Sequence, residues 1–300
     1  MTKVRAFLKL ARPANVVTAV ADIWAGFAIV GGVSLLFGDK PEEYWEALIW
    51  LTFSTLGLYG GGVAFNDIFD ANLDAKERPE RPIPSGQVKI FWAVVFASFL
   101  LIGGIVCAAQ VSIWSGQLAV FITVFALVYD AWGKHQPIFG PINMGACRSG
   151  NLLLGMTAYY YAIGQFWYVS LIPLAYIAAI TMISRGEVHG KNKSALLGGL
   201  VLYLSITVAV IGLALFHRGM MAWEVLPFLV LFCVMVYPPL FKAIKLQQPA
   251  LIGKAVKAGV IALIVLNATL ASAFAGILPG IAIIALLPIS LWLAKIFAVT

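Results

Sequence analysis

LGLYGGGVAFNDIFDANLDAKERPERPIPSG, residues 56–86, passes directly from an apolar run into a stretch with eight charged side chains. The acidic residues are Asp67, Asp70, Asp74, Glu77 and Glu80, and the basic residues are Lys76, Arg78 and Arg81. Only 11% of the chain is charged, so this stretch holds a large share of its charge. Carboxylates that follow an apolar helix lie near membrane depth, where charged groups are costly and are usually kept for a function.

The remainder of the chain is too apolar to form a water-soluble domain. Its 300 residues are 62% hydrophobic with a mean hydropathy of +0.95, which leaves too few polar residues to cover a surface in water. A helix needs about 20 mostly apolar residues to cross a bilayer, and such segments recur along the whole sequence. We therefore predict an all-α, polytopic integral membrane protein with a single domain over residues 1–300. The ten predicted spans are 14–37, 45–66, 90–110, 112–132, 141–163, 167–184, 195–216, 223–241, 255–274 and 277–297.

The basic residues are distributed as expected for ten spans with an internal N-terminus. All but two of the 20 Lys and Arg residues then fall on one side, the exceptions being Lys40 and Arg218. Because cytoplasmic loops carry an excess of Lys and Arg, we expect both termini and the longer loops (67–89, 133–140 and 185–194) on the cytoplasmic face of the inner membrane. Loop cations beside anionic lipid account for most of the net charge of +7, so no nucleic-acid partner is expected.

The acidic cluster predicts a metal site. Asp67, Asp70 and Asp74 fall at i, i+3 and i+7, which would place them on one helix face, and Asn66 joins them through its relation to Asp70. Three such carboxylates repel one another unless a cation neutralises them, and Mg²⁺ takes oxygen ligands that it shares with substrate phosphates. The alternative is a solvated acidic cap that pairs with the neighbouring basic residues.

The segment RPERPIPSG, residues 78–86, follows the acids with a stiff proline-rich turn. That turn can hold Arg81, whose planar guanidinium suits phosphate oxygens. Acids for a metal, an arginine for an anion and an apolar bundle for a tail together indicate a prenyl diphosphate ligand.

These residues resemble a known family. NDIFDANLD resembles the NDxxDxxxD motif of the UbiA superfamily of intramembrane prenyltransferases, and RPERPIPSG resembles its usual continuation. RPANVVTAVADIWAG, with Asn15 and Asp22, matches the first helix, and YDAWGK places Tyr129 and Lys134 at the family's YxxxxK element. The resemblance covers about residues 10–275 and implies a helical bundle, typically of nine spans, with acidic motifs over a central cavity. Residues 277–297 would add a tenth span.

The second acidic motif of the family is altered in this chain. SRGEVHGK, residues 184–191, has Ser184, Glu187, His189 and Lys191 where the family carries Asp, Asp, Glu and Asp. Together with MGACRSGNLLLGM, which contains Arg148 and Asn151, this pattern resembles the EboC-like branch. The resemblance implies that Glu187 is a secondary metal ligand beside Asp67, Asp70 and Asp74, and that Arg185 and Lys191 contact the diphosphate. His189 is either a ligand or general base, or a loop histidine bonded to the backbone.

Three further charged residues lie in or at the ends of apolar segments. Arg148 must face the bundle interior or extend to its edge. Asp22 lies about ten residues into the first span, so we expect it in the cavity, where it would orient an acceptor. Asp130 either pairs with Lys134 or serves the site, and the sequence leaves both interpretations open.

The expected function is Mg²⁺-dependent transfer of an isoprenyl group from a farnesyl or geranylgeranyl type of diphosphate to a small acceptor. The expected catalytic residues are Asp67, Asp70, Asp74, Lys134, Glu187 and His189, and the expected substrate-binding residues are Asn15, Asp22, Asn66, Arg81, Tyr129, Arg148, Asn151, Arg185 and Lys191. The branch resemblance favours a hydroxyl of a cyclitol or sugar-like compound, and an aromatic acceptor of quinone type is the alternative. A terpene cyclase or diphosphatase would use the same head-group chemistry. An ion-coupled transporter is disfavoured, because we find no internal repeat and the charges lie at helix ends.

Overall fold

The computed structural model describes residues 3–186, 190 and 192–297, and every regular element in these ranges is a helix. The elements in chain order are α1(Lys3–Ala11), α2(Pro13–Ile29), α3(Gly32–Leu35), α4(Pro41–Phe69), α5(Ala71–Glu77), α6(Ile90–Val111), α7(Ile113–Ala131), η1(Gly133–His135), α8(Phe139–Met156), η2(Thr157–Ala162), α9(Ile163–Phe166), η3(Trp167–Ser170), α10(Leu171–Ser184), α11(Lys193–Arg218), η4(Gly219–Val225), α12(Leu226–Leu246), α13(Pro249–Ala275), α14(Ile277–Ile284) and α15(Leu286–Ile296). The η elements are short 3₁₀ helices. This composition confirms the predicted all-α class.

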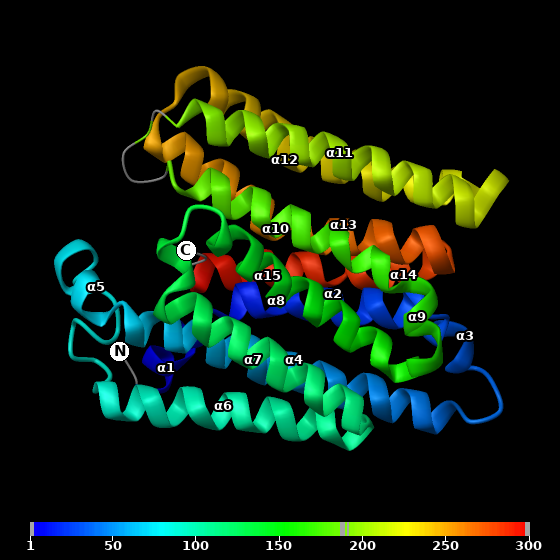
Figure 1. Ribbon diagram of the computed structural model, residues 1–300, viewed down its shortest axis with the longest axis horizontal. Helices are drawn as coiled ribbons and strands as arrows, with labels where there is room; N and C mark the ends of the chain where they lie inside the picture. Colours follow the sequence, from blue (N-terminus) through cyan, green and yellow to red (C-terminus); the bar gives the residue numbers. More distant parts are fainter. Residues whose placement is uncertain (1–2, 187–189, 191, 298–300) are drawn as a thin grey trace.

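The helices account for ten passes through a membrane. Seven helical segments of the described chain are long and apolar enough to span one, and two of them run for 46 and 54 residues. Each of these two folds back on itself in Figure 1, at η2 and at η4, so each makes two passes. The backbone leaves helical geometry at Tyr159 and at Gly219, where φ is +53°. With the shorter apolar helix Pro13–Ile29, the count agrees with the ten predicted spans.

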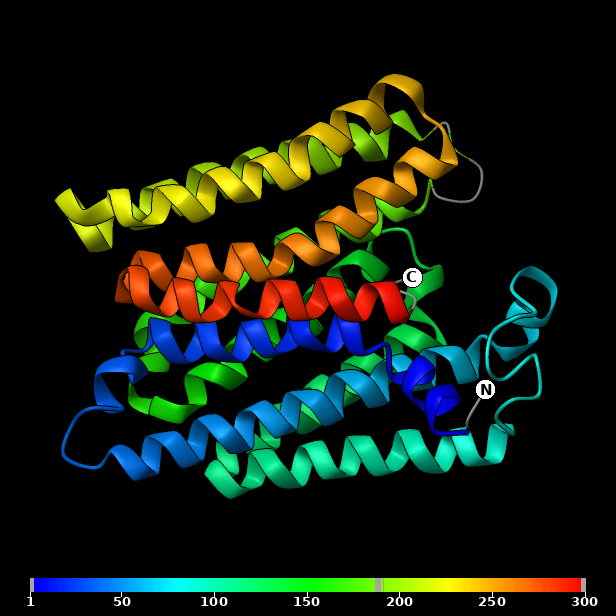
Figure 2. The ribbon, with the colours of Figure 1, turned by 180° about the vertical axis from the view of Figure 1, so that it is seen from behind.

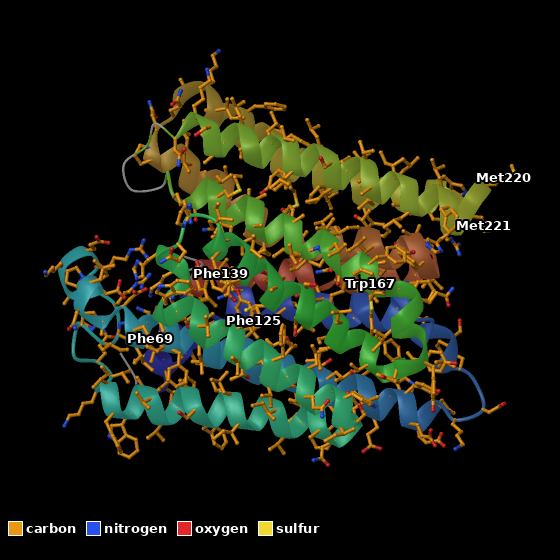
Figure 3. All side chains as sticks on the ribbon, in the orientation of Figure 1. Phe69, Phe125, Phe139, Trp167, Met220 and Met221 are labelled. Carbon is orange, nitrogen blue, oxygen red and sulfur yellow. The ribbon has the colours of Figure 1, made fainter. Side chains whose placement is uncertain are left out.

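The passes alternate in direction along one axis. Figure 1 shows α5, the start of α6 and the end of α15 at one end of the bundle, and the loop before α4 at the other. Figure 2 shows α2 and α15 side by side at the back of the molecule, where the Ser290 hydroxyl donates to the Ala14 carbonyl oxygen over 2.9 Å. Met220 and Met221, at the tip of the α11–α12 hairpin, lie opposite to Phe69 and Phe139 in Figure 3. The peripheral helices expose large apolar side chains such as Phe99 and Val208, as expected for a surface in contact with lipid.

Small residues bring α2 and α8 into backbone contact. A Cβ atom added at Gly26 would overlap the Leu152 carbonyl oxygen, and one added at Gly155 would overlap that of Ile23. Helices in a membrane associate through such close packing, since burial from water does not drive them together. This contact fixes the distance between α2 and α8, whose polar side chains meet inside the bundle.

The first predicted span and the predicted arrangement of the acidic stretch both differ from the structure. The first span was expected over 14–37, but α2 ends at Ile29 because Gly31 adopts a φ of +81° and the chain turns into α3. The acidic stretch was expected on one continuous helix, but α4 ends at Phe69 and α5 begins at Ala71. Asp70 is the joint between them, with φ −87° and ψ 1°. Asp67, Asp70 and Asp74 are therefore divided between the last turn of α4, a joint and α5.

Candidate functional site

A cavity of about 470 Å³ lies inside the bundle and opens toward the end where α4 gives way to α5. Its lining comes chiefly from α4, α5, α7, α8, α10 and α13, and α2 adds Asn15. We call the ring of polar residues at this end the charged end: Arg12, Asn66, Asp70, Asp74, Glu77, Arg78, Arg81, Asp130 and Lys134. We call the side formed by α10 and α13 the apolar wall: Ile177, Ile180, Val256, Val260 and Leu263.

Arg81 joins two aspartates of the acidic stretch. Its Nη1 donates to Asp74 Oδ2 over 2.7 Å and to Asp67 Oδ1 over 3.2 Å. Both carboxylates are buried, and the Arg81 side chain is only 14% exposed. The proline-rich turn after α5 therefore places its arginine on the acids, and the predicted role of that turn is consistent with this geometry.

Arg12 is a member of the charged end that the sequence reasoning missed. Its Nη2 donates to Asp67 Oδ1 over 2.6 Å. Arg12 has a φ of +46° between α1 and α2, a left-handed conformation that costs a non-glycine residue about 1–2 kcal/mol. Strain of this kind persists where surrounding contacts fix it, and it gathers at functional sites. The available signal was an arginine directly before Pro13, at the start of an apolar span.

Asp67 lies behind these two arginines. It is 5% exposed and does not line the cavity. Asp70 and Asp74 do line it. Of the three predicted metal ligands, Asp70 and Asp74 thus face the space that a ligand would enter, while Asp67 holds Arg12 and Arg81 in place.

Lys134 and Asp130 take different partners. Lys134 Nζ lies 2.5 Å from Asp70 Oδ1, whereas Asp130 Oδ1 accepts from Asn66 Nδ2 over 2.8 Å. The direct pairing of Asp130 with Lys134, one of the two interpretations left open above, is absent from the described contacts. Tyr129 also lines the cavity, beside Asp130 at the end of α7.

A second polar group lies deeper in the bundle, in the middle of α2, α4, α8 and α13. We call it the deep polar cluster: Thr18, Asp22, Thr55, Arg148, Asn151 and Asn267. Arg148 Nε lies 2.7 Å from Asp22 Oδ2, and its Nη2 donates to Thr18 Oγ1 over 2.6 Å. Arg148 is 5% exposed and lies 5.2 Å from the centre of the Tyr59 ring. Of the two positions considered for Arg148, the bundle interior is therefore correct.

The expectation that Asp22 faces the cavity needs correction. Asp22 is fully buried and is not among the cavity residues, whereas Arg148, Asn151 and the nearby Asn15 are. Asn151 Nδ2 donates to Asp22 Oδ2 over 3.0 Å, and Asn267 Nδ2 donates to Asp22 Oδ1 over 2.6 Å. Asp22 thus holds Arg148 and Asn151, which line the cavity, from behind them.

Several predicted residues lie on the loop after α10. Glu187, His189 and Lys191 are outside the described residues, so their predicted roles stay predictions. Arg185 is exposed, and its Nη2 donates to the Gln136 carbonyl oxygen over 2.6 Å. Ser184 lines the cavity.

The donor set at the charged end fits a hard divalent cation. Within the ranges that the structure describes, no three His, Cys, Asp or Glu side chains are grouped closely enough to hold a metal by themselves. Mg²⁺ does not need such a group, because it commonly uses one or two carboxylates together with water and substrate phosphates. Asp70 and Asp74 supply carboxylate oxygens of this kind on the cavity wall.

Comparison with known proteins gives a consistent result. The UbiA prenyltransferase family model matches residues 25–189, which is more than half of the chain. A digeranylgeranylglyceryl phosphate synthase of Methanoculleus marisnigri is 27% identical over 227 residues, covering 75% of this chain and 77% of that protein. The enzyme of the same name from Methanosarcina mazei is 30% identical over 188 residues, covering 59% of this chain and 62% of its own.

A solved structure shares the fold. The structure of a UbiA homologue from Archaeoglobus fulgidus, bound to DMAPP and Mg²⁺, superposes with a TM-score of 0.64 and 14% sequence identity. The match covers 93% of this chain and 99% of that one.

Proposed function

The chain belongs to the UbiA prenyltransferase family and is an intramembrane prenyltransferase, and we propose that it moves an isoprenyl group from a prenyl diphosphate to a hydroxyl group of a small polar acceptor. The observation that carries this proposal is the single cavity that joins the charged end to the apolar wall. A prenyl diphosphate has the same two parts, an anionic head and an apolar tail. The tail would lie along the apolar wall, with the head among Arg12, Arg81 and Lys134.

Charge balance supports a requirement for Mg²⁺. Arg12, Arg81 and Lys134 each already contact a carboxylate. A diphosphate would therefore meet cations that are neutralised, unless another cation occupies the carboxylates. Mg²⁺ held by Asp70 and Asp74 would release Lys134 and Arg81 for phosphate oxygens and would neutralise developing negative charge. The relative from Archaeoglobus fulgidus is bound to DMAPP and Mg²⁺, which is consistent with this assignment.

The reaction breaks the bond between C1 of the prenyl group and the diphosphate oxygen, and the electron pair leaves with diphosphate. Arg12, Arg81 and Lys134 stabilise the charge that develops on the leaving group, which is the interaction that accelerates the step. The acceptor oxygen then bonds to C1 and loses its proton. Asp130 is placed to take that proton, because it lines the cavity and no described residue donates to its Oδ2. The surrounding helices limit access of water to the allylic cation.

The acceptor is proposed to be a hydroxyl compound of the cyclitol or sugar type. The altered stretch at residues 184–191 supports this choice and the EboC-like assignment that accompanies it. Digeranylgeranylglyceryl phosphate synthases are named for a product built on glyceryl phosphate, so relatives of this chain also work on a polyol skeleton. The segregation of basic residues supports an orientation with both termini and the charged end on the cytoplasmic side of the inner membrane.

The test is a transfer assay with purified protein, Mg²⁺, and geranyl, farnesyl or geranylgeranyl diphosphate. An acceptor panel contains polyols and phenols, and pyrophosphate and products are followed by mass spectrometry. Release of pyrophosphate only with a polyol supports the proposal, and release only with a phenol supports the aromatic alternative. Release without any acceptor would instead show a cyclase or diphosphatase.

A further inference from the structure

The deep polar cluster carries no net charge. Its one cation, Arg148, lies against its one anion, Asp22, with 2.7 Å between Nε and Oδ2. Their side chains are 6% and 0% exposed, so water screens this pair very little. A buried arginine in a membrane protein is costly, and Asp22 offsets part of that cost by balancing its charge.

Asp22 itself is fully buried and does not line the cavity, so a ligand there would not contact it. Asn267 of α13 donates to its Oδ1, and Asn151 of α8 donates to its Oδ2 beside Arg148. Asn151 has both N–H donors used, because its amide also donates to the Ala19 carbonyl oxygen, and its Oδ1 accepts from Thr55. Asp22 therefore acts only through the residues that it holds.

Arg148, in contrast, keeps hydrogen-bond donors for a ligand. Its Nη2 is used by Thr18, but none of the described residues accepts from its Nη1, and the side chain lines the cavity. The Tyr59 ring lies 5.2 Å from the guanidinium and lines the same space. Tyr59 lies seven residues before Asn66 on α4, which is about 10 Å along the helix. The distance between this surface and the charged end is therefore about the length of a small molecule.

We propose that Asp22 determines the charge of the acceptor: by neutralising Arg148, it makes the deep end of the cavity select an uncharged hydroxyl compound and reject a carboxylate or phosphate. An anion there would gain little from an arginine that is already paired, and it would face the Asp22 carboxylate directly behind. An uncharged hydroxyl accepts from Arg148 and bonds with the Tyr59 hydroxyl without that repulsion. Asn267 is a positioning residue that holds Asp22. This inference rests on the proposed function, since it places the acceptor opposite the diphosphate.

The experiment changes the net charge of the cluster and measures preference between matched acceptors. The probes are glucose against glucuronate and 4-hydroxybenzyl alcohol against 4-hydroxybenzoate, which differ in a carboxylate at nearly constant size. Binding to the full-length protein is measured by calorimetry in the presence of Mg²⁺ and a non-hydrolysable prenyl diphosphate analogue. Asp22→Asn makes the cluster positive, Arg148→Gln makes it negative, and the double variant restores neutrality.

The expected result is a preference that follows charge. Wild type binds the neutral member of each pair more tightly. Asp22→Asn shifts the ratio of the two affinities toward the anion by about tenfold or more, and Arg148→Gln shifts it toward the neutral member. The double variant returns the ratio toward that of wild type. Asn267→Asp adds a carboxylate next to Asp22 at constant size and shifts the ratio away from the anion. This variant replaces Asp22→Asn as the test if Asp22→Asn does not fold. Glu224→Gln, which breaks the Arg218–Glu224 pair at the opposite end of the bundle, leaves the ratio unchanged.

Equal losses for both members of each pair in the Asp22 and Asn267 variants would show a purely structural role and overturn the inference. Failure of every probe to bind to wild type would also overturn it. Pyrophosphate release from a prenyl diphosphate, measured on the same preparation, separates these outcomes from failure of the proposed function. If pyrophosphate is released but binding shows no charge-dependent preference, only the inference fails. If no pyrophosphate is released, both the inference and the proposed function fail.

Discussion

The Arg81 guanidinium donates to the Asp74 carboxylate over 2.7 Å, across the turn that follows α5. The same nitrogen reaches Asp67, so one arginine contacts two acids. A metal that binds the acids and a diphosphate that binds the arginine would each exchange these contacts for new ones. Binding of the two ligands is therefore expected to be cooperative. The metal releases the arginine for the diphosphate, and the diphosphate releases the acids for the metal.

Arg81→Ala is expected to lower kcat/KM for the prenyl diphosphate by about 10²–10³-fold, the usual cost of removing one preorganised donor to a developing charge. Arg81→Lys should recover only part of the loss, since an ammonium group cannot form two parallel bonds. Lys76→Ala removes an exposed cation from α5, outside the cavity lining, and should leave kcat/KM near wild type. A similar effect of the Lys76 and Arg81 variants would show that only general surface charge matters.

The metal requirement is expected to depend on Asp70 and Asp74 more than on Asp67. Asp70→Asn and Asp74→Asn should raise the Mg²⁺ concentration for half-maximal pyrophosphate release by about tenfold or more, because each removes a carboxylate ligand. Asp67→Asn should mainly raise KM for the prenyl diphosphate, since Asp67 holds Arg12 and Arg81. Glu80→Gln, on the exposed turn, is the control. Full activity in EDTA, or an equal Mg²⁺ shift in all three aspartate variants, would contradict this division.

The apolar wall is expected to set the length of prenyl chain. Val260 on α13 is partly exposed and lines the cavity, so Val260→Trp would fill part of the space for the tail. We expect kcat/KM for geranylgeranyl diphosphate to fall by about tenfold relative to geranyl diphosphate, from steric exclusion of the longer chain. The ratio of the two constants is the measurement, because it is insensitive to a partial loss of folded protein. An unchanged ratio would place the tail elsewhere.

The orientation in the membrane can be tested by cysteine labelling. Met220 at the tip of the α11–α12 hairpin is 98% exposed. Ser85 is exposed and belongs to the segment between α5 and α6, which lies at the opposite end of the bundle in Figure 1. In a background without the three native cysteines, a membrane-impermeant maleimide should label Met220→Cys on intact cells and Ser85→Cys only after permeabilisation. The reverse pattern would show the inverted orientation. Labelling of both cysteines on intact cells would show that the two positions do not lie on opposite sides of the membrane.

The sequence predicted the passes well, because each is a long apolar segment and the bilayer core admits little other than helices. Helices α6 and α7 lie within one residue of their predicted ranges. Helix ends inside apolar runs were missed, as at Gly31, because backbone conformation rather than hydropathy ends α2 there. The short helix α1 and the joint at Asp70 were missed as well. Local geometry decides such features, and a periodicity argument assumes that one helix continues.

The residues of the site were recognised by type, whereas most of their partners were not. Asp22 and Asn267 are 245 positions apart, and no local pattern joins them. A signal for Asn267 did exist, since a lone asparagine in an apolar helix carries the same cost that directed attention to Asp22. Arg12 and its partner Asp67 are 55 positions apart, and no local pattern joins them either. In each case the missing information was which helices pack together.

The most direct test of the account is a structure of the protein with Mg²⁺ and a prenyl thiodiphosphate that cannot ionise. The account predicts the thiodiphosphate at the charged end, Mg²⁺ between it and the carboxylates of Asp70 and Asp74, Arg81 turned from Asp74 toward a phosphate oxygen, and the tail along α10 and α13. A ligand bound outside this cavity, or a diphosphate in the cavity with the Arg81–Asp74 contact intact and no metal on either aspartate, would contradict it.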